Sequence, residues 1–530
     1  MTRKKINQTV PLVSIPTPPP NTPIADKRFS SEVWQNNPFS QLLAQQYLIG
    51  SQWLRQQTEL IAKQFPAANA VQMRFMTEQM IAASAPSNYL ATNPEALAAL
   101  VETNGASLQN GLANMLCDLR KGRMTQTDET AFEVGKNLAV SPGAVIFEND
   151  FFQLLQYSPS TATVHSIPLL MVPPCINKFY ILDLQPETSF VKYAVEQGHT
   201  VFLVSWRNPI DLELNHATWD DYIAQGIVTA ILVVQAITQQ PTINALGFCV
   251  GGTLLTTALA VLAAKGQSPV ASLTLLTTLL DFSDPGVLGV FMDEHQVKQR
   301  EQTIAVAGKG GLMSAKELNN SFSMLRPNDL IWNYVVSQYL KGQPPPKAFD
   351  LLYWNGDSTN IPGPMFAWYL RHLYLENRLP KGTLTVLGET VNVSKLTFPC
   401  YVFSAKEDHI VPWQSAYISA KLLGDDGKSV RYVQGASGHI AGVINPAHKH
   451  KRSYKVSEPL SLKKGCLSTS PEVWEASAPE FAGSWWVDWS AWLAQYAGKK
   501  IAANTILGNE QHPVIEAAPG RYVAVRAMPL

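Results

Sequence analysis

The sequence has few charged residues and no excess of either sign, which argues against nucleic acid as its main partner. Charged residues make up 15% of the 530 positions, and 41 Lys and Arg residues balance 41 Asp and Glu residues. Proteins that bind nucleic acid usually concentrate Lys and Arg in basic patches, so we expect no nucleic-acid partner. Hydrophobic residues reach 46%, which is typical of a globular protein with apolar surface for an apolar partner or product.

Cysteine is also scarce, and its distribution argues against a metal site or a disulfide framework. The five cysteines are widely scattered, and no two have the spacing of metal ligands: Cys117, Cys175, Cys249, Cys400 and Cys466. A reduced, cytoplasmic protein without a bound metal is therefore expected. The basic residues at positions 3–5 are followed by no apolar stretch, so we predict no signal peptide. We also predict no apolar run long enough to span a bilayer.

The length of the chain exceeds what one compact core usually holds, so we expect more than one domain. Residues 1–25 are rich in proline and predict a disordered tail. Residues 26–160 have helical spacing of apolar residues, and the pairs Asn37-Pro38 and Asn93-Pro94 are typical helix starts. We therefore predict a helical N-terminal domain at 26–160 and a catalytic domain at 161–530.

Short apolar runs alternate with helical or loop segments in the second of these domains. The runs lie at 167–172, 200–205, 242–246, 272–279, 399–404 and 429–433. Such alternation indicates an α/β fold with a mostly parallel sheet covered on both faces. The alternation stops at about 281–398, where aromatic residues, prolines and glycines are frequent. An insertion of this kind between two strands predicts a lid over the active end of the sheet.

Cys249 occupies the central motif of the chain, a strand, sharp turn and helix. Gly247 and Gly251 lie two residues to either side of it, and Gly252 follows. This spacing has the form of the nucleophile elbow G-x-S-x-G with sulfur in place of oxygen. The start of the following helix would favour the thiolate form. A buried cysteine between packing glycines is the alternative, but the position of the motif between strand and helix favours a nucleophile.

A cysteine nucleophile needs a base, and the base needs an orienting group. Asp408 follows the run at 399–404, and His439 follows the run at 429–433. Nucleophile, acid and histidine therefore come in the chain order of α/β-hydrolases, each at the carboxyl end of a strand. Glu407 competes with Asp408 for the orienting role. His409 is a rival base, but it directly follows the acid and we expect at most a supporting role for it.

The oxyanion of an acyl-transfer intermediate needs backbone N–H donors. We expect one from Val250, directly after the nucleophile, and one from the loop 172–178 after the first core strand. Pro173 and Pro174 have no N–H group, so Cys175 or Ile176 would donate, and we place Ile176 in this role. A thiol that attacks a thioester forms another thioester and keeps the acyl group activated, which favours transfer to an alcohol over simple hydrolysis.

The motif resembles the cysteine-containing elbow of polyhydroxyalkanoate (PHA) synthases, and the resemblance covers nearly the whole chain from about residue 26. It is carried by the segments GFCVGG (247–252), VPPCINKFY (172–180), VSWRNP (204–209), TTLLDF (277–282), LRPNDLIWNY (325–334), YWNGDSTN (353–360) and SGHIAGVINP (437–446). The segment AAPGRYV (517–523) is similar to the end of the single-subunit, class I form. The resemblance implies an α/β-hydrolase fold with a lid and a helical N-terminal domain.

The resemblance further implies an acyltransferase that polymerises (R)-3-hydroxyacyl-CoA into polyester and releases CoA. It implies a cytoplasmic homodimer at the surface of polyester granules, without a cofactor, because the substrate itself carries the CoA. By position, Cys249 would hold the acyl chain and His439 would be the base. Asp408 would activate the 3-hydroxyl group, as well as or instead of orienting His439.

Two further residues are candidates by the same matching. Arg326 would contact CoA, since its planar fork suits phosphate, although a structural ion pair is the alternative. Ala441 matches a position tied to the length of the substrate chain. Two departures from the family pattern are Cys175, at a position often held by an aromatic residue, and Ala447, in place of a second proline. The rival enzyme is a cysteine-type α/β-hydrolase, similar to a dienelactone hydrolase or a thioesterase, and the non-enzymatic rival is a granule-coat protein.

Overall fold

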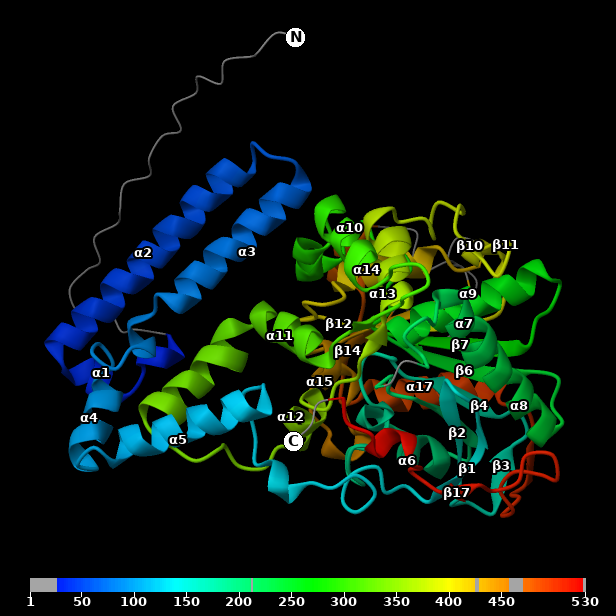
Figure 1. Ribbon diagram of the computed structural model, residues 1–530. Coiled ribbons are helices and arrows are strands. Elements are labelled where there is room, and N and C mark those ends of the chain that lie inside the picture. The colour runs from blue at the N-terminus through cyan, green and yellow to red at the C-terminus, as the bar shows by residue number, and fades with distance from the viewer. Residues whose placement is uncertain (1–25, 211–212, 425–428, 457–469, 528–530) are drawn as a thin grey trace, which may run out of the picture. The chain divides into compact units, whose positions relative to one another are not determined.

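The computed structural model describes residues 26–210, 213–424, 429–456 and 470–527 (Figure 1). The tail predicted at 1–25 and Cys466 lie outside these residues. The chain forms two compact units. The first contains the chain up to Asp128 together with 320–347, and the second contains 129–319 and 348–529.

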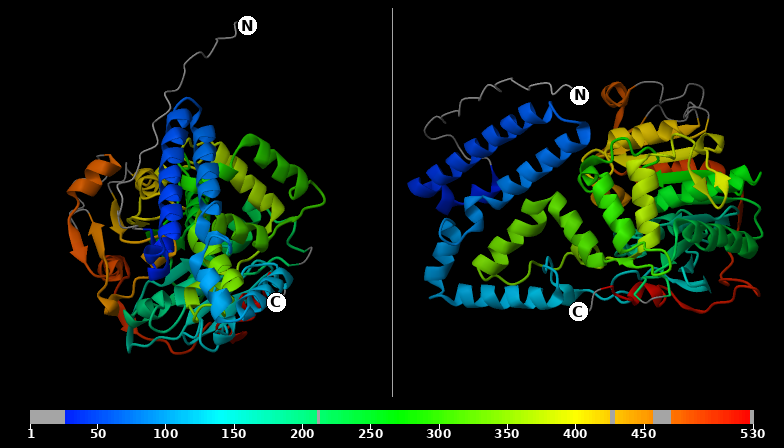
Figure 2. Two further views of the ribbon diagram at one scale, coloured as in Figure 1. Left: turned by 90° about the vertical axis from the view of Figure 1, so that its left-hand side faces the viewer. Right: turned by 45° about the horizontal axis from the view of Figure 1, so that its top comes forward.

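The first unit is helical, and its helices begin where the capping residues predict. Asn37 accepts hydrogen bonds from the backbone N–H groups of Phe39 and Ser40 at 3.0 and 3.1 Å, and Asn93 caps a second helix in the same way. The helices α2 and α3 lie side by side (Figure 2) and are linked by exposed ion pairs such as Arg55 with Glu78. The helices before residue 128 are α1 (Glu32–Asn36), α2 (Pro38–Ala62), α3 (Ala67–Ala83), α4 (Pro94–Glu102) and α5 (Ala106–Lys121).

These two units differ from the domains that the sequence predicts. Part of the insertion expected at 281–398 belongs to the first unit, where Tyr339 donates to the buried carboxylate of Asp118 at 2.7 Å. Gln338 donates to the Thr125 carbonyl at 2.6 Å in the same region. A buried carboxylate is stable only with hydrogen-bond donors around it, so 320–347 completes the helical unit. The strands at 143–157, placed in the helical domain by the sequence, belong to the second unit.

The second unit is built on an eleven-stranded sheet in the order β15-β14-β13-β12-β7-β6-β4-β5-β2-β1-β17. Its six central strands are parallel and correspond to the six apolar runs. They are β4 (Leu169–Val172), β5 (Val201–Trp206), β6 (Ile243–Phe248), β7 (Val270–Leu276), β12 (Cys400–Ala405) and β13 (Val430–Gly435). The antiparallel outer strands are β1 (Gly143–Glu148), β2 (Phe152–Tyr157), β14 (Ser453–Val456), β15 (Glu480–Ala482) and β17 (Glu516–Ala517). The predicted α/β fold is confirmed.

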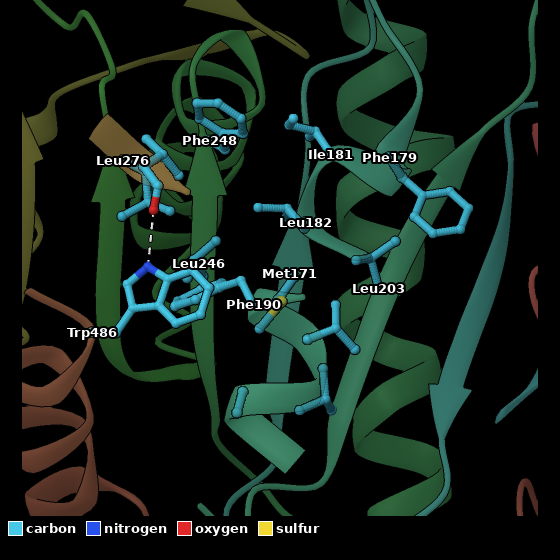
Figure 3. Packing of buried hydrophobic residues seen from close by; sticks show 14 of the residues in the cluster. Met171, Phe179, Ile181, Leu182, Phe190, Leu203, Leu246, Phe248, Leu276 and Trp486 are labelled. Carbon is cyan, nitrogen blue, oxygen red and sulfur yellow. Dashed lines mark hydrogen bonds between the residues drawn. The ribbon is translucent and has the colours of Figure 1, made fainter. Parts of the chain in front are cut away.

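Helices cover the sheet, and side chains of the helices pack against side chains of the strands to form the core. Figure 3 shows Leu246 and Phe248 of β6 beside Leu276 of β7, all fully buried. Trp486 closes this cluster and donates from Nε1 to the Val443 carbonyl at 2.9 Å. The larger helices of the unit are α6 (Phe190–Glu196), α8 (Thr229–Thr238), α9 (Val250–Ala264), α10 (Glu294–Thr303), α13 (Gly363–Tyr369), α14 (Trp413–Lys421), α16 (Pro471–Ser477) and α17 (Trp485–Leu493).

One helical segment, Trp219–Thr238, is long and apolar enough to cross a membrane by length and composition alone. The prediction that no apolar run could span a bilayer did not include this segment. Nearly half of its apolar window, 44%, is buried inside the protein, and it packs against α9. A helix in the core of a folded domain can be equally long and apolar. The hydropathy of Trp219–Thr238 is therefore weak evidence for a membrane span.

A buried pair of histidine rings lies in the second unit. His165 and His199 stack with ring centroids 4.8 Å apart, and neither ring nitrogen of His199 has a hydrogen-bond partner among the described residues. Burial lowers the pKa of His199 to about 3, and the positive charges of His165 and Lys500 add to this effect.

We therefore expect His199→Phe to reduce acid sensitivity. The folded-state pKa of His199 lies below its unfolded value, so the stability that the neutral ring provides is present above about pH 6.5 and is lost as the pH falls toward 3. Between pH 7 and pH 5 the wild type should lose roughly 2 kcal/mol more than His199→Phe. Urea denaturation at the two pH values measures this difference, and equal losses would contradict it.

Candidate active site

Cys249 lies at the sharp turn between β6 and α9, as the elbow motif predicts. Its backbone has φ 54° and ψ −129°, a conformation that L-residues rarely adopt. Such a conformation costs about 1–3 kcal/mol and persists only where the surrounding structure imposes it. The Cys249 N–H donates to the Leu276 carbonyl at 2.9 Å, and the Cys249 carbonyl accepts from Gly252 at 2.9 Å. The turn therefore holds the partly exposed thiol at the carboxyl end of the parallel strands.

The glycines around Cys249 are required by close backbone contacts. A Cβ atom at Gly247 would lie 2.4 Å from the Gly252 Cα atom. A Cβ atom at Gly251 would lie 2.5 Å from the carbonyl oxygens of both Val172 and Pro173. Backbone atoms cannot yield to such contacts, so α9 packs directly against β6 and against the loop that follows β4.

Asp408 and His439 come together at the ends of β12 and β13. His439 Nδ1 lies 2.6 Å from Asp408 Oδ2, and the Asp408 side chain is fully buried. The other carboxylate oxygen, Oδ1, accepts from the N–H groups of Ile410 at 2.9 Å and Val411 at 2.8 Å. The carboxylate is thus fixed by the backbone on one side and orients the imidazole on the other. The His439 ring also stacks on Phe248, the residue before the nucleophile, with centroids 5.7 Å apart.

The charges around His439 favour its protonated form. Burial alone disfavours the imidazolium, but the charges of Asp408 and of a Cys249 thiolate, together with side-chain hydrogen bonds to both, raise the pKa of His439 to about 10. The stacking of the His439 ring on Phe248 places the imidazole beside the residue that precedes Cys249. A thiolate–imidazolium pair is the reactive state of cysteine enzymes that use histidine as the base.

The structure separates the rival residues in this region. Glu407 has an exposed side chain, whereas Asp408 contacts His439. His409 follows Asp408 on the same loop and is partly exposed. The structure therefore brings Asp408 and His439 together, and their roles as acid and base stay predictions.

The candidate oxyanion donors lie on two segments that touch each other. Val250 is the first residue of α9, so its N–H has no acceptor within the helix. Cys175 and Ile176 lie on the loop after β4, where the Cys175 carbonyl accepts from the Thr359 hydroxyl at 2.8 Å. Burial raises the pKa of the Cys175 thiol to about 12, and the nearby charge of Cys249 adds to this. Cys175 is therefore a neutral thiol close to the nucleophile.

Two tyrosines that the sequence analysis did not single out lie close to Cys249. Tyr369 belongs to α13, and Tyr374 follows it in a π-helical turn. Burial raises the pKa of both phenols, and the charge of Cys249 raises each further. Their rings pack edge to face at 5.1 Å. The abundance of aromatic residues in the insertion was the available signal, but nothing in the sequence showed which of them face the thiol.

Two candidate residues remain, Arg326 and Ala441. Arg326 is in the first unit, where its half-exposed guanidinium pairs with Asp329 at 2.5 Å. This ion pair matches the structural alternative for Arg326, and the CoA contact stays a prediction. Ala441 lies in the short helix α15 (His439–Val443), and its carbonyl accepts from Arg452. Within the described ranges, no three His, Cys, Asp or Glu side chains are grouped to hold a metal ion.

Comparison with known proteins identifies the family. Residues 25–194 match the family described as the N-terminus of poly-beta-hydroxybutyrate polymerase (PhaC), and residues 168–446 match the alpha/beta hydrolase fold. The chain is 54% identical over 510 residues to the poly(3-hydroxyalkanoate) polymerase subunit PhaC of Cupriavidus necator, covering 95% of this chain and 84% of the relative. It is 37% identical over 507 residues to poly(3-hydroxyalkanoate) polymerase 1 of Ectopseudomonas oleovorans, covering 94% and 87%.

Among solved structures, the chain matches the monoacylglycerol lipase of Paleococcus ferrophilus with a TM-score of 0.36, 12% identity and coverage of 64% of this chain and 99% of that one. The resemblance to class I PHA synthases is confirmed by the polymerases above, which match nearly the full length of the chain. The chain therefore belongs to the poly(3-hydroxyalkanoate) polymerase family, acyltransferases built on the α/β-hydrolase fold.

Proposed function

We propose that this chain polymerises (R)-3-hydroxyacyl groups from their CoA thioesters, with Cys249 carrying the growing acyl chain. The observation that supports this most is the set of contacts at Cys249. The thiol lies on a strained turn, its base His439 is held by Asp408 at 2.6 Å, and the surrounding charges favour the imidazolium form of His439. The curated relatives are poly(3-hydroxyalkanoate) polymerases, which supports the choice of substrate.

In the first half-reaction, Cys249 Sγ attacks the thioester carbonyl carbon of the substrate. The thiol proton resides on His439 Nε2, and the carbonyl oxygen becomes an oxyanion that accepts from the N–H groups of Val250 and Ile176. When the intermediate collapses, the bond to the CoA sulfur breaks and His439 returns the proton to that sulfur. CoA leaves as a thiol, and the acyl group stays on Cys249 as a thioester.

In the second half-reaction, the 3-hydroxyl group of another hydroxyacyl unit attacks the Cys249 thioester. His439 Nε2 takes the hydroxyl proton, an ester bond forms, and the bond from the carbonyl carbon to Cys249 Sγ breaks. The proton then restores the thiolate–imidazolium pair. One thioester is consumed for each ester formed, so no cofactor is needed beyond the CoA that the substrate carries.

The same proposal includes the setting in which the enzyme works. The product is an apolar polyester, and α5 exposes apolar side chains at helical spacing, including Leu112 at 53% and Leu119 at 68%. We propose that the cytoplasmic enzyme acts as a homodimer at the surface of polyester granules. Exposed apolar side chains of this kind suit both a dimer interface and contact with an apolar granule surface.

We expect the protein to release CoA from (R)-3-hydroxybutyryl-CoA and to convert the hydroxyacyl groups into insoluble polymer in equal molar amount. Thiol titration measures the CoA, and methanolysis of the washed precipitate followed by gas chromatography measures the polymer. The (S)-enantiomer serves as the control and should give neither product. Release of CoA with free 3-hydroxybutyrate as the only acid product would favour the cysteine-hydrolase alternative and contradict the polymerase.

A further inference from the structure

Lys178, at the end of the loop 172–178, is a buried cation that the reaction does not use. The residue is 2% exposed, and its ammonium donates to the backbone carbonyl of Val525. Burial lowers the pKa of Lys178 to about 8, which the charge of Asp357 opposes and the charge of Arg526 reinforces. An ammonium in such a place is costly unless it is hydrogen-bonded. Lys178 therefore depends on the carbonyl that it contacts.

That carbonyl belongs to the C-terminal segment 522–526. Asn208, itself 1% exposed, donates to the same Val525 oxygen at 3.2 Å. Val523 is 1% exposed in the core, and Arg526 donates to the Tyr353 hydroxyl and stacks over its ring at 5.3 Å. Two donors from loops that follow β4 and β5 thus converge on one oxygen of a segment that is itself anchored on both sides.

The insertion holds the same loop from another direction. Trp354 donates from Nε1 to the Lys178 carbonyl at 2.8 Å, and the Thr359 hydroxyl donates to the Cys175 carbonyl at 2.8 Å. Tyr180, two residues beyond Lys178, donates to Asp357 at 2.9 Å. Every one of these contacts lies within the second unit. The insertion therefore holds the loop through the backbone carbonyls of Cys175 and Lys178, and the C-terminal segment holds it through the Lys178 ammonium.

The position of this loop determines the geometry around Cys249. The loop presses against the start of α9, because a Cβ atom at Gly251 would already lie 2.5 Å from the carbonyl oxygens of Val172 and Pro173. Trp206 donates to the Pro173 carbonyl at 2.9 Å and holds that end of the loop. A displacement at Lys178 would consequently change the separation between the N–H groups of Ile176 and Val250.

We propose that Lys178 and the C-terminal segment 522–526 form a positioning clamp that sets the distance between the two oxyanion donors. Lys178 is a positioning residue in this proposal and touches no reacting atom. The proposal rests on the proposed function, since it assigns the loop 172–178 to the oxyanion. Loss of a whole oxyanion donor costs about 10²–10³-fold in kcat, so misplacement of one donor is expected to cost about 10–100-fold, with KM within about 3-fold.

The test compares two variants at the same position with an exposed lysine as the control. Lys178→Met keeps the volume of the side chain and removes all donors, whereas Lys178→Gln keeps an N–H donor for Val525. Lys192 on α6, which is 47% exposed, provides the matched control Lys192→Met. Chains that end at Tyr522 and at Ala527 test the other half of the clamp, because only the shorter one lacks the Val525 carbonyl.

Two rates are measured for each of these proteins: the burst of CoA in a single turnover, and the alkylation of Cys249 by iodoacetamide. Alkylation needs the thiolate but no oxyanion donors, so it reports the Cys249–His439 pair alone. We expect Lys178→Met to slow the burst by about 10–100-fold, with Lys178→Gln between it and the wild type, and with alkylation within about 2-fold in both. Lys192→Met and the chain ending at Ala527 should behave as the wild type does.

An unchanged burst in Lys178→Met would overturn the proposal. Equal reductions in the rate of the CoA burst and in the rate of Cys249 alkylation would also overturn it, because they would show that the substitution disturbs the whole active site. Should Lys178→Met give too little folded protein, Lys178→Gln and the chain ending at Tyr522 decide by the same pair of rates. A wild-type protein whose Cys249 is alkylated normally but that shows no CoA burst would contradict the proposed function itself. This outcome distinguishes failure of the proposed function from failure of the clamp proposal.

Discussion

Replacing Cys249 with alanine is expected to stop both CoA release and polymer formation, lowering kcat/KM by about 10⁵-fold or more. Cys175 is not expected to replace Cys249, because this thiol is buried and its pKa is raised to about 12, so it remains a poor nucleophile near neutral pH. Thiol titration with (R)-3-hydroxybutyryl-CoA measures the loss. Cys249→Ser should also be severely impaired, because an alkoxide is far harder to generate than a thiolate with the same base.

The matched control is Cys117→Ala. Cys117 is an exposed cysteine in α5 of the first unit, so its removal should leave CoA release unchanged. Circular dichroism of both variants checks that the fold persists. Continued release of CoA by Cys249→Ala at more than a trace level would show that another residue carries the acyl group.

The second large effect is expected for Asp408→Asn, which should lower the rate of the CoA burst by about 10³–10⁴-fold. The geometry explains why so small a change matters. Oδ1 accepts from two backbone N–H groups, at Ile410 and Val411, so the asparagine oxygen must occupy that side. The amide N–H₂ then faces His439 Nδ1 and forces it to accept, which leaves the ring proton on Nε2. A ring in this tautomer cannot take the thiol proton.

This variant also separates two roles for Asp408. If the carboxylate orients His439, the burst and the alkylation of Cys249 both slow in Asp408→Asn. If instead it only activates the 3-hydroxyl group, the burst stays normal and elongation alone fails, so one CoA is released per site and no polymer forms. The full burial of the Asp408 side chain and the use of both its oxygens favour the first outcome. A normal burst would contradict it.

The parallel core of the fold could be predicted from the sequence because each of its strands is a short, mostly apolar run. All six runs correspond to parallel strands, and the acid and histidine lie just past β12 and β13. Parallel strands end at one edge, so residues that follow different strands must meet there. The glycine spacing around Cys249 was equally informative, because backbone contacts as short as those at Gly247 leave no other residue type possible.

Other features depend on long-range contacts that no local pattern encodes. The strand β2 contains the polar residues Gln153 and Gln156, which are buried against distant segments, so its sequence does not resemble a core strand. The segment 320–347 belongs to the helical unit because Asp118 and Thr125 need its donors. The contact of Lys178 with Val525 spans 347 positions, and neither residue alone suggests the other.

The separation of Lys178 and Val525 along the sequence affects how the chain folds while it is being synthesised. The sheet acquires β17 at its edge only when residues 516–517 arrive to pair with β1, and the Val525 carbonyl that accepts from Lys178 is supplied later still. A chain emerging from the ribosome can collapse around its parallel strands, but until residues 516–525 have been synthesised it carries an exposed strand edge and a buried ammonium that lacks its carbonyl acceptor. We therefore expect a nascent chain stalled before residue 516 to release no CoA and to aggregate.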